Sequence, residues 1–144
     1  MERRRARRPP EHPLVLVVEG HADTRELYAQ ALRSFGFEIE TVDDVADGFA
    51  RAWETHPDVI ATEIPLSMNT GWRFIQDLQC DPRTRDIPVV VVTSDGRATA
   101  RARAEHEGCA AFLLKPFLPD VLATTLRNVL TIRVQVHDRI PLSR

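Results

Sequence analysis

Leu14-Val15-Leu16-Val17-Val18 is the stretch of sequence that decides the fold class. It is a continuous apolar run rich in β-branched residues, and such runs are typical of strands that are covered on both faces of a sheet. A second run of this kind, Val89–Val92, comes later in the chain. Because strands covered on both faces occur in parallel sheets flanked by helices, the two runs predict an α/β domain.

Helical and strand-like segments alternate around these two runs. Short apolar segments predict strands at residues 14–18, 37–42, 59–62, 89–92 and 111–114. Apolar residues at helical spacing predict helices around residues 24–35, 45–53, 71–80, 97–107 and 119–130. This alternation predicts a doubly wound, five-stranded parallel sheet with helices on both faces.

The 144 residues suffice for one domain of ordinary size. We expect a flexible Arg/Pro-rich arm at residues 1–13, a folded domain at 14–131 and a C-terminal tail at 132–144. No apolar run is long enough to span a membrane, and no stretch has the pattern of a secretory signal. The two cysteines lack the spacing of a disulfide framework or a zinc site, so we expect a protein of the reducing cytoplasm.

Polar residues follow four of the predicted strands at the point where each one ends. Glu19-Gly20 follows the first strand, Glu63 the third, Thr93-Ser94 the fourth and Lys115 the fifth. In doubly wound sheets, ligands bind outside the carboxyl ends of the strands, where the strand order reverses. These residues are therefore expected to converge into a carboxylate–cation site that can handle a phosphoryl group.

Three stretches resemble the receiver domain of response regulators, the CheY-like module of two-component systems. They are residues 16–25 (LVVEGHADTR), residues 58–63 (DVIATE) with Gly71 beyond them, and residues 87–94 (IPVVVVTS) with residues 112–117 (FLLKPF). The similarity extends from Leu14 to Leu130. It implies a flavodoxin-like (βα)5 fold and a function in phosphorelay signal transduction rather than as an enzyme.

The resemblance also implies roles for individual residues. In receiver domains an Asp after the third strand accepts a phosphoryl group, and acidic residues after the first strand join it in holding Mg²⁺. A hydroxyl and a lysine after the fourth and fifth strands bind phosphoryl oxygens. The equivalent positions here are Glu63 for the acceptor, Glu19 and Gly20 for the acidic pair, Thr93, Ser94 and Lys115 for phosphoryl binding, and Phe112 for the aromatic switch.

Three departures from the family pattern alter this site. Glu63 and Glu19 each carry one methylene more than Asp, Gly20 brings no carboxylate, and Leu66-Ser67 replaces the usual Met-Pro of the loop. Mg²⁺ requires near-octahedral oxygen ligands at about 2.0–2.1 Å. Glu19 and Glu63 are therefore expected to form a weak or absent Mg²⁺ site, and no other cofactor is indicated.

Two functions follow from the resemblance. The favoured one is an atypical receiver that works by protein–protein interaction, in which Glu63 forms a salt bridge with Lys115, the only lysine in the chain. The alternative is a receiver that still accepts a phosphoryl group from a histidine kinase in a Mg²⁺-dependent reaction. An unrelated nucleotide-binding protein or hydrolase is disfavoured, because the chain has no GxGxxG, P-loop or GxSxG motif.

Other residues at the predicted site have two interpretations each. Thr93 and Ser94 either cap the following helix or couple the site to an output face. Phe112 is expected to lie in the core rather than to act as a rotating switch. Glu63 is interpreted as the partner of Lys115 rather than as a solvated loop residue.

The expected partners are histidine kinases or output proteins, and neither a membrane nor nucleic acid. Arg97, Arg101 and Arg103 are interface candidates on one predicted helix, with a solvated basic face as the alternative. A homodimer through that helix, the fifth strand and the last helix is also expected. The arm lacks aromatic residues for base stacking and is interpreted as an unspecific tail.

Overall fold

The structure, a computed structural model, describes residues 11–64 and 70–139. Five parallel strands alternate with five helices in these residues, which confirms the predicted fold class. The strands are β1 (Leu14–Val18), β2 (Glu38–Val42), β3 (Val59–Glu63), β4 (Val89–Thr93) and β5 (Ala111–Leu114). The helices are α1 (Ala22–Ser34), α2 (Val45–Thr55), α3 (Thr70–Cys80), α4 (Ala98–His106) and α5 (Pro119–Arg139).

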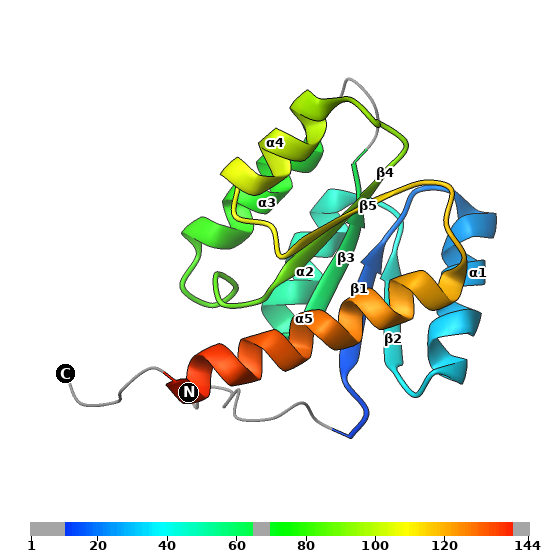
Figure 1. Cartoon of the computed structure of the whole chain (residues 1–144), viewed down its shortest axis with the longest axis horizontal. Coiled ribbons are helices and arrows are strands. Elements are labelled where there is room, and N and C mark those ends of the chain that lie inside the picture. The colour runs from blue at the N-terminus through cyan, green and yellow to red at the C-terminus, as the bar shows by residue number, and fades with distance from the viewer. Residues whose placement is uncertain (1–10, 65–69, 140–144) are drawn as a thin grey trace.

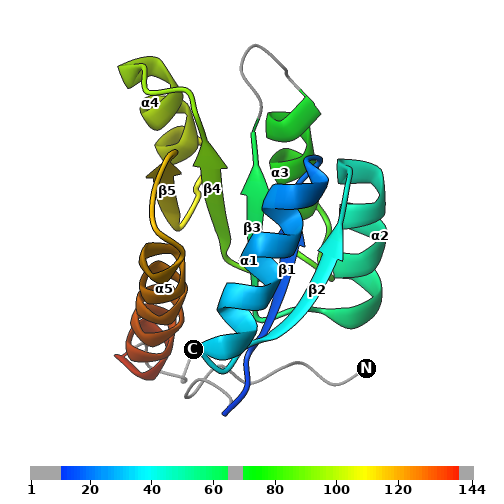
Figure 2. The ribbon, with the colours of Figure 1, turned by 90° about the vertical axis from the view of Figure 1, so that its right-hand side faces the viewer.

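The sheet has the strand order β2-β1-β3-β4-β5, and every neighbouring pair is parallel. The chain moves from β1 to the edge at β2 and then returns to the other side of β1, so the order reverses between β1 and β3. Figures 1 and 2 show the helices packed on the two faces of this twisted sheet. The reversal places the carboxyl ends of β1 and β3 side by side, where doubly wound sheets bind ligands.

Alternate residues of the central strands supply two separate cores. Val15, Val17 and Val90 point to one face, where they pack against buried side chains of α1 and α5 such as Leu32 and Leu126. Neighbouring residues of the same strands point to the other face, which α2, α3 and α4 cover. This two-sided burial is the physical reason for the continuous apolar runs in the sequence.

The helix α5 is longer than the sequence predicted. We expected it to end at Leu130, but it continues to Arg139. Residues 131–139 contain neither glycine nor proline, and the first helix breaker after them is Pro141. The expected tail therefore begins as helix. Residues 1–10 of the predicted arm, the Leu66-Ser67 pair of the loop and residues 140–144 lie outside the described residues.

Candidate functional site at the carboxyl ends of the strands

The strand order brings four predicted site residues to one edge of the sheet. Glu19 follows β1, Glu63 ends β3, Thr93 ends β4 and Lys115 follows β5. These four strands are consecutive neighbours in the sheet. The backbone continues the ladder at this edge, because the Lys115 amide donates to the Thr93 carbonyl at 2.8 Å.

The Lys115 ammonium lies against both carboxylates. Its Nζ is 2.5 Å from Glu63 Oε1 and 3.2 Å from Glu19 Oε1. The three side chains are shielded from solvent, with exposed fractions of 23% for Lys115, 16% for Glu63 and 5% for Glu19. Two carboxylates and one ammonium give the cluster a formal charge of −1.

Each carboxylate is further constrained by its surroundings. Glu19 Oε2 accepts a hydrogen bond from the His21 amide at 3.0 Å, so both oxygens of Glu19 have partners. Glu63 Oε1 is buried, and within residues 11–64 and 70–139 no hydrogen-bond donor of good geometry reaches it. Its contact with Nζ is therefore an ion pair, and Lys115 is the group that compensates its charge.

The environment shifts the pKa values of Glu63 and Lys115. Burial raises the pKa of the Glu63 carboxyl above its usual 4.5, and the attraction of the Lys115 ammonium opposes this rise without cancelling it. Burial also acts to lower the pKa of Lys115, but the carboxylates of Glu63 and Glu19 outweigh burial and raise it above 10.5. Lys115 is consequently a permanent cation at neutral pH.

Thr93 is engaged by the backbone rather than by the charged cluster. Its hydroxyl donates to the Ile64 carbonyl at 2.7 Å and accepts from the Asp95 amide at 3.1 Å. Thr93 is buried, whereas its neighbour Ser94 is exposed. Thr93 thus ties the segment after β3 to the segment that leads into α4.

The acidic positions do not fit a Mg²⁺ ion well. Mg²⁺ prefers carboxylate and water oxygens in octahedral geometry. Gly20 offers no side-chain oxygen, and Glu19 and Glu63 each direct an oxygen at the Lys115 ammonium. A metal ion would have to displace the Lys115 ammonium from these two carboxylates. Glu19, Gly20 and Glu63 together are therefore a poor set of ligands for Mg²⁺.

The three predicted interface arginines all have partners within the chain. Arg97 forms an ion pair with Asp95, Nη2 to Oδ2, at 2.6 Å. The guanidinium of Arg101 lies 4.9 Å from the centre of the Phe112 ring. Arg103 donates to Glu107 Oε2 at 2.8 Å and lies 5.2 Å from the Trp72 ring. Phe112 itself is partly buried and packs against the core under α2, α3 and α4.

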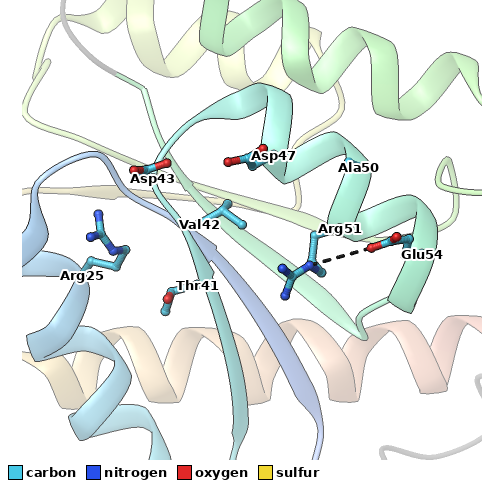
Figure 3. Close-up of a pocket in the computed structure, with 8 residues that line it drawn as sticks. All are labelled: Arg25, Thr41, Val42, Asp43, Asp47, Ala50, Arg51 and Glu54. Carbon is cyan, nitrogen blue, oxygen red and sulfur yellow. Dashed lines mark ion pairs between the residues drawn. The ribbon is translucent and has the colours of Figure 1, made fainter.

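Sequence reasoning missed the role of Arg25 and the groove beside it. Arg25 Nη1 donates to the Glu19 carbonyl at 2.8 Å and so fixes the end of β1. Arg25 lines a groove of about 410 Å³ between α1 and α2, together with Asp43, Asp47 and Arg51 among other residues. Figure 3 shows how these side chains lie around it. The groove is lined by both charge signs, and no sequence motif marks it.

These geometric features agree with the comparisons to known proteins. Residues 15–127 match the family model described as response regulator receiver domain. The fold and the residues at its strand ends define a signalling domain of the receiver class. The chain belongs to the response regulator receiver domain family.

Relatives and solved structures support this assignment. The chain is 33% identical over 116 residues to the phosphate regulon transcriptional regulatory protein PhoB of Escherichia coli (strain K12), a match that covers 81% of this chain and 51% of PhoB. Response regulator Rre1 of Synechocystis sp. is also 33% identical, over 121 residues, with 81% and 51% covered. The chain thus spans about half the length of these curated relatives.

Among solved structures, the chemotaxis protein CheY4 of Vibrio cholerae superposes with a TM-score of 0.76 at 25% identity, over 82% of this chain and 98% of CheY4. A response regulator structure from Chloroflexus aurantiacus reaches the same TM-score at 22% identity, with 83% and 98% covered.

Among the helices of residues 11–64 and 70–139, none combines the length and the apolar composition that a membrane span requires.

Proposed function

We propose that this receiver domain acts in two-component signalling through protein–protein contacts and without phosphoryl transfer to Glu63. The observation that carries the proposal is the position of the Lys115 ammonium, which contacts both Glu63 and Glu19. In the family this lysine binds the phosphoryl group, whereas here it neutralises the carboxylate at the acceptor position. Glu63 thus takes the place of both the acceptor and the anion that the acceptor would carry.

Electrostatics favours the contact of Lys115 with Glu63 and Glu19 over an arrangement in which Lys115 leaves Glu63 to bind a phosphoryl group. Separating a shielded carboxylate from its ammonium leaves two poorly solvated charges, which typically costs several kcal/mol when the pair is fully buried. The cost is smaller here, because Lys115 keeps an exposed fraction of 23%. An incoming phosphoryl group would nevertheless add negative charge to a cluster that is already at −1, without a metal to offset it.

The second candidate is a receiver that still accepts a phosphoryl group from a histidine kinase with Mg²⁺. The retained Thr93 and Lys115 favour it, because both phosphoryl-binding groups of the family are present at this edge of the sheet. In that reaction a Glu63 oxygen would attack the phosphorus of a phosphohistidine, the P–N bond would break, and the imidazole would leave with the bonding electron pair. Glu63 would first have to leave Lys115.

A titration of ¹⁵N-labelled protein with Mg²⁺ and beryllofluoride, a phosphoryl mimic, distinguishes the two candidates. The proposed function predicts no shift of the amides of Glu19, Glu63, Thr93 and Lys115 at millimolar ligand. Shifts that cluster at these residues would support the phosphorylatable receiver instead. A receiver domain with the usual acidic pair and acceptor Asp, titrated in parallel, shows that the mimic is active.

The proposed setting is a cytoplasmic signalling pathway in which partners read the surface of the domain. Two free cysteines and the family membership support this setting. We also propose a homodimer through α4, β5 and α5. Because Arg97, Arg101 and Arg103 have partners within the chain, the exposed apolar residues Leu114, Leu118 and Val121 are the better candidates for the dimer contact.

A further inference from the structure

The strand β2 forms an edge of the sheet, with no strand of residues 11–64 and 70–139 on its outer side. It pairs with β1 alone, and Figure 2 shows it at this edge of the sheet. The groove between α1 and α2 lies at the end of β2, because Thr41 and Val42 line it together with residues of both helices. Edge strands are usually protected by charged side chains or by a segment that covers them.

Most of the negative charge of residues 11–144 is concentrated along this edge. The whole chain has a formal charge of −2, and residues 1–10, with five arginines and one glutamate, have +4, which leaves −6 for residues 11–144. Residues 38–54 contain six carboxylates and one arginine, a formal charge of −5. We call these residues the acidic edge. Its carboxylates are those of Glu38, Glu40, Asp43, Asp44, Asp47 and Glu54.

The arginines beside the acidic edge neutralise it only in part. Arg51 lies 4.0 Å from Glu40 and 4.0 Å from Glu54, at the outer limit of an ion pair. Arg25 directs its Nη1 to the Glu19 carbonyl. Asp43 and Asp47 are exposed, and no cation of the described residues forms an ion pair with either of them. The acidic edge can therefore bind further cations.

Residues 1–10 join the rest of the chain beside this edge. The Pro13 carbonyl accepts a hydrogen bond from the Glu38 amide at 2.9 Å, and His12 Nδ1 lies 3.2 Å from the Gly36 carbonyl oxygen. The chain thus enters β1 next to the start of β2. Ten residues can extend over at most about 33–36 Å, whereas a five-residue strand rises about 17 Å. Residues 1–10 are therefore long enough to reach the groove at the far end of β2.

We propose that residues 3–8 (RRRARR), the arginine segment, bind along the acidic edge and in the groove of the same chain instead of forming an unspecific tail. Arginine suits this role, because its planar guanidinium pairs with carboxylates in a fixed geometry. The bound segment covers the edge of β2 and is withheld from other anionic molecules. The inference is independent of whether Glu63 accepts a phosphoryl group, since neither Glu63 nor Lys115 takes part in it.

NMR spectra of the ¹⁵N-labelled full chain test the inference. The wild type is compared with a glutamine variant, in which glutamine replaces Arg3, Arg4, Arg5, Arg7 and Arg8. We expect the amide signals of groove residues such as Thr41, Val42 and Ala50 to differ between the two proteins at low salt. At least about half of each difference should be lost between about 0.01 M and 1 M salt, because the Debye length falls from about 30 Å to about 3 Å.

Two pairs of substitutions show whether the carboxylates of the groove are the binding partners. Asp43→Asn with Asp47→Asn removes two charges from the groove, and the glutamine substitutions should then no longer shift the groove amides. Asp77→Asn with Glu105→Gln, at exposed positions on α3 and α4, is the matched control and should leave these shifts as in the wild type. Should the first pair fail to fold, Glu38→Gln with Glu54→Gln replaces it.

A mixing experiment separates binding within one chain from binding to a second copy. Unlabelled wild type added to the ¹⁵N-labelled glutamine variant should leave the groove amides in place. Shifts in this mixture would mean that the arginine segment binds another molecule, and the inference would be wrong. It would also be wrong if the glutamine substitutions moved only the amides of residues 1–13, or if both pairs of substitutions abolished the shifts equally.

Discussion

At the scale of single residues, the Lys115 ammonium compensates the charges of two carboxylates, those of Glu19 and Glu63. Eighteen of the nineteen cationic residues are arginines, and the remaining one is placed between two shielded carboxylates. A compact ammonium can contact two single oxygens at once, whereas the planar guanidinium of arginine favours paired contacts with one carboxylate. Replacement of Lys115 should therefore affect both Glu19 and Glu63.

Lys115→Gln is expected to lower the free energy of unfolding by about 1–3 kcal/mol, because it leaves two shielded carboxylates without a cation. Urea denaturation measures the change. In a double-mutant cycle with Glu63→Gln, the double variant should recover part of this loss, with a coupling energy of about 1–2 kcal/mol. Strictly additive effects of the two substitutions would show that the pair contributes nothing to stability.

The stability that Lys115 contributes should depend on pH in the alkaline range. The folded protein raises the pKa of Lys115 above 10.5, so it holds this proton more tightly than the unfolded chain does. The stability that the ammonium contributes is then fully present below pH 10.5 and is lost as the pH rises through the higher pKa of the folded state.

We therefore expect the difference in unfolding free energy between wild type and Lys115→Gln to be constant from about pH 8 to pH 10 and to shrink at higher pH. Cys109 also has a raised pKa, but it titrates in both proteins and cancels in the difference. Burial raises the pKa of Tyr28 and the Lys115 ammonium lowers it, so Tyr28 does not cancel and both proteins are compared in a Tyr28→Phe background. Urea denaturation of both proteins over this range measures it. A difference that grows above pH 10.5 would contradict the assigned sign.

At the scale of secondary-structure elements, α4 packs on the sheet through few and small apolar side chains. Its buried residues are Ala100 and Ala104, which offer little apolar surface. Polar contacts supplement them: Glu107 Oε2 accepts from Arg103 at 2.8 Å and from Gln76 of α3 at 2.9 Å. Burial acts to raise the pKa of Glu107, but these two hydrogen-bond donors outweigh it and lower the pKa below 4.5.

Glu107→Gln should therefore loosen α4 specifically. Loss of the charged acceptor is expected to cost about 0.5–1.5 kcal/mol locally, which corresponds to roughly two- to thirteenfold faster amide exchange in α4. Hydrogen exchange followed by NMR measures this. Glu105→Gln, an exposed position on the same helix, is the matched control and should leave the exchange unchanged. Equal effects of both substitutions would mean that Glu107 does not anchor the helix.

The elements also show what the sequence could predict. The strands were predictable because two-sided burial leaves long β-branched runs such as 14–18 and 89–93. The placement of Glu63 and Lys115 at one edge of the sheet was predictable, because both follow parallel strands. Their direct contact was not, because β4 lies between β3 and β5 and the lysine side chain has to span it. The contacts of Arg25 with Glu19 and of Arg103 with Trp72 were not predictable either, because they depend on side-chain conformations and helix packing that no local pattern encodes.

At the scale of the whole molecule, exposed apolar side chains gather near the start of α5. Leu118 has an exposed fraction of 69%, Leu114 of 45% and Val121 of 40%. Leu27 on α1, with 53%, is a similarly exposed leucine outside the proposed dimer face. These two leucines provide a direct comparison for the proposed homodimer.

We expect Leu118→Glu to convert the homodimer to a monomer, because it places a charge within the apolar contact of each subunit. Leu27→Glu should leave the dimer intact. Sedimentation equilibrium of the wild type and both variants measures the association constant. Equal weakening by both substitutions, or a wild type that is monomeric at high micromolar concentration, would contradict a dimer through this face.

The length of α5 has a mechanical consequence for the molecule. Its 21 residues rise about 32 Å along the helix axis, roughly twice the length of a five-residue strand. The helix packs on the sheet through residues from Leu122 to Leu130 and continues beyond them to Arg139. A tilt of about 10° about its first turn would carry its far end through roughly 6 Å, and the buried residues from Leu122 to Leu130 oppose such a tilt. The direction in which the far end of α5 points is therefore set by how its middle turns pack on the sheet.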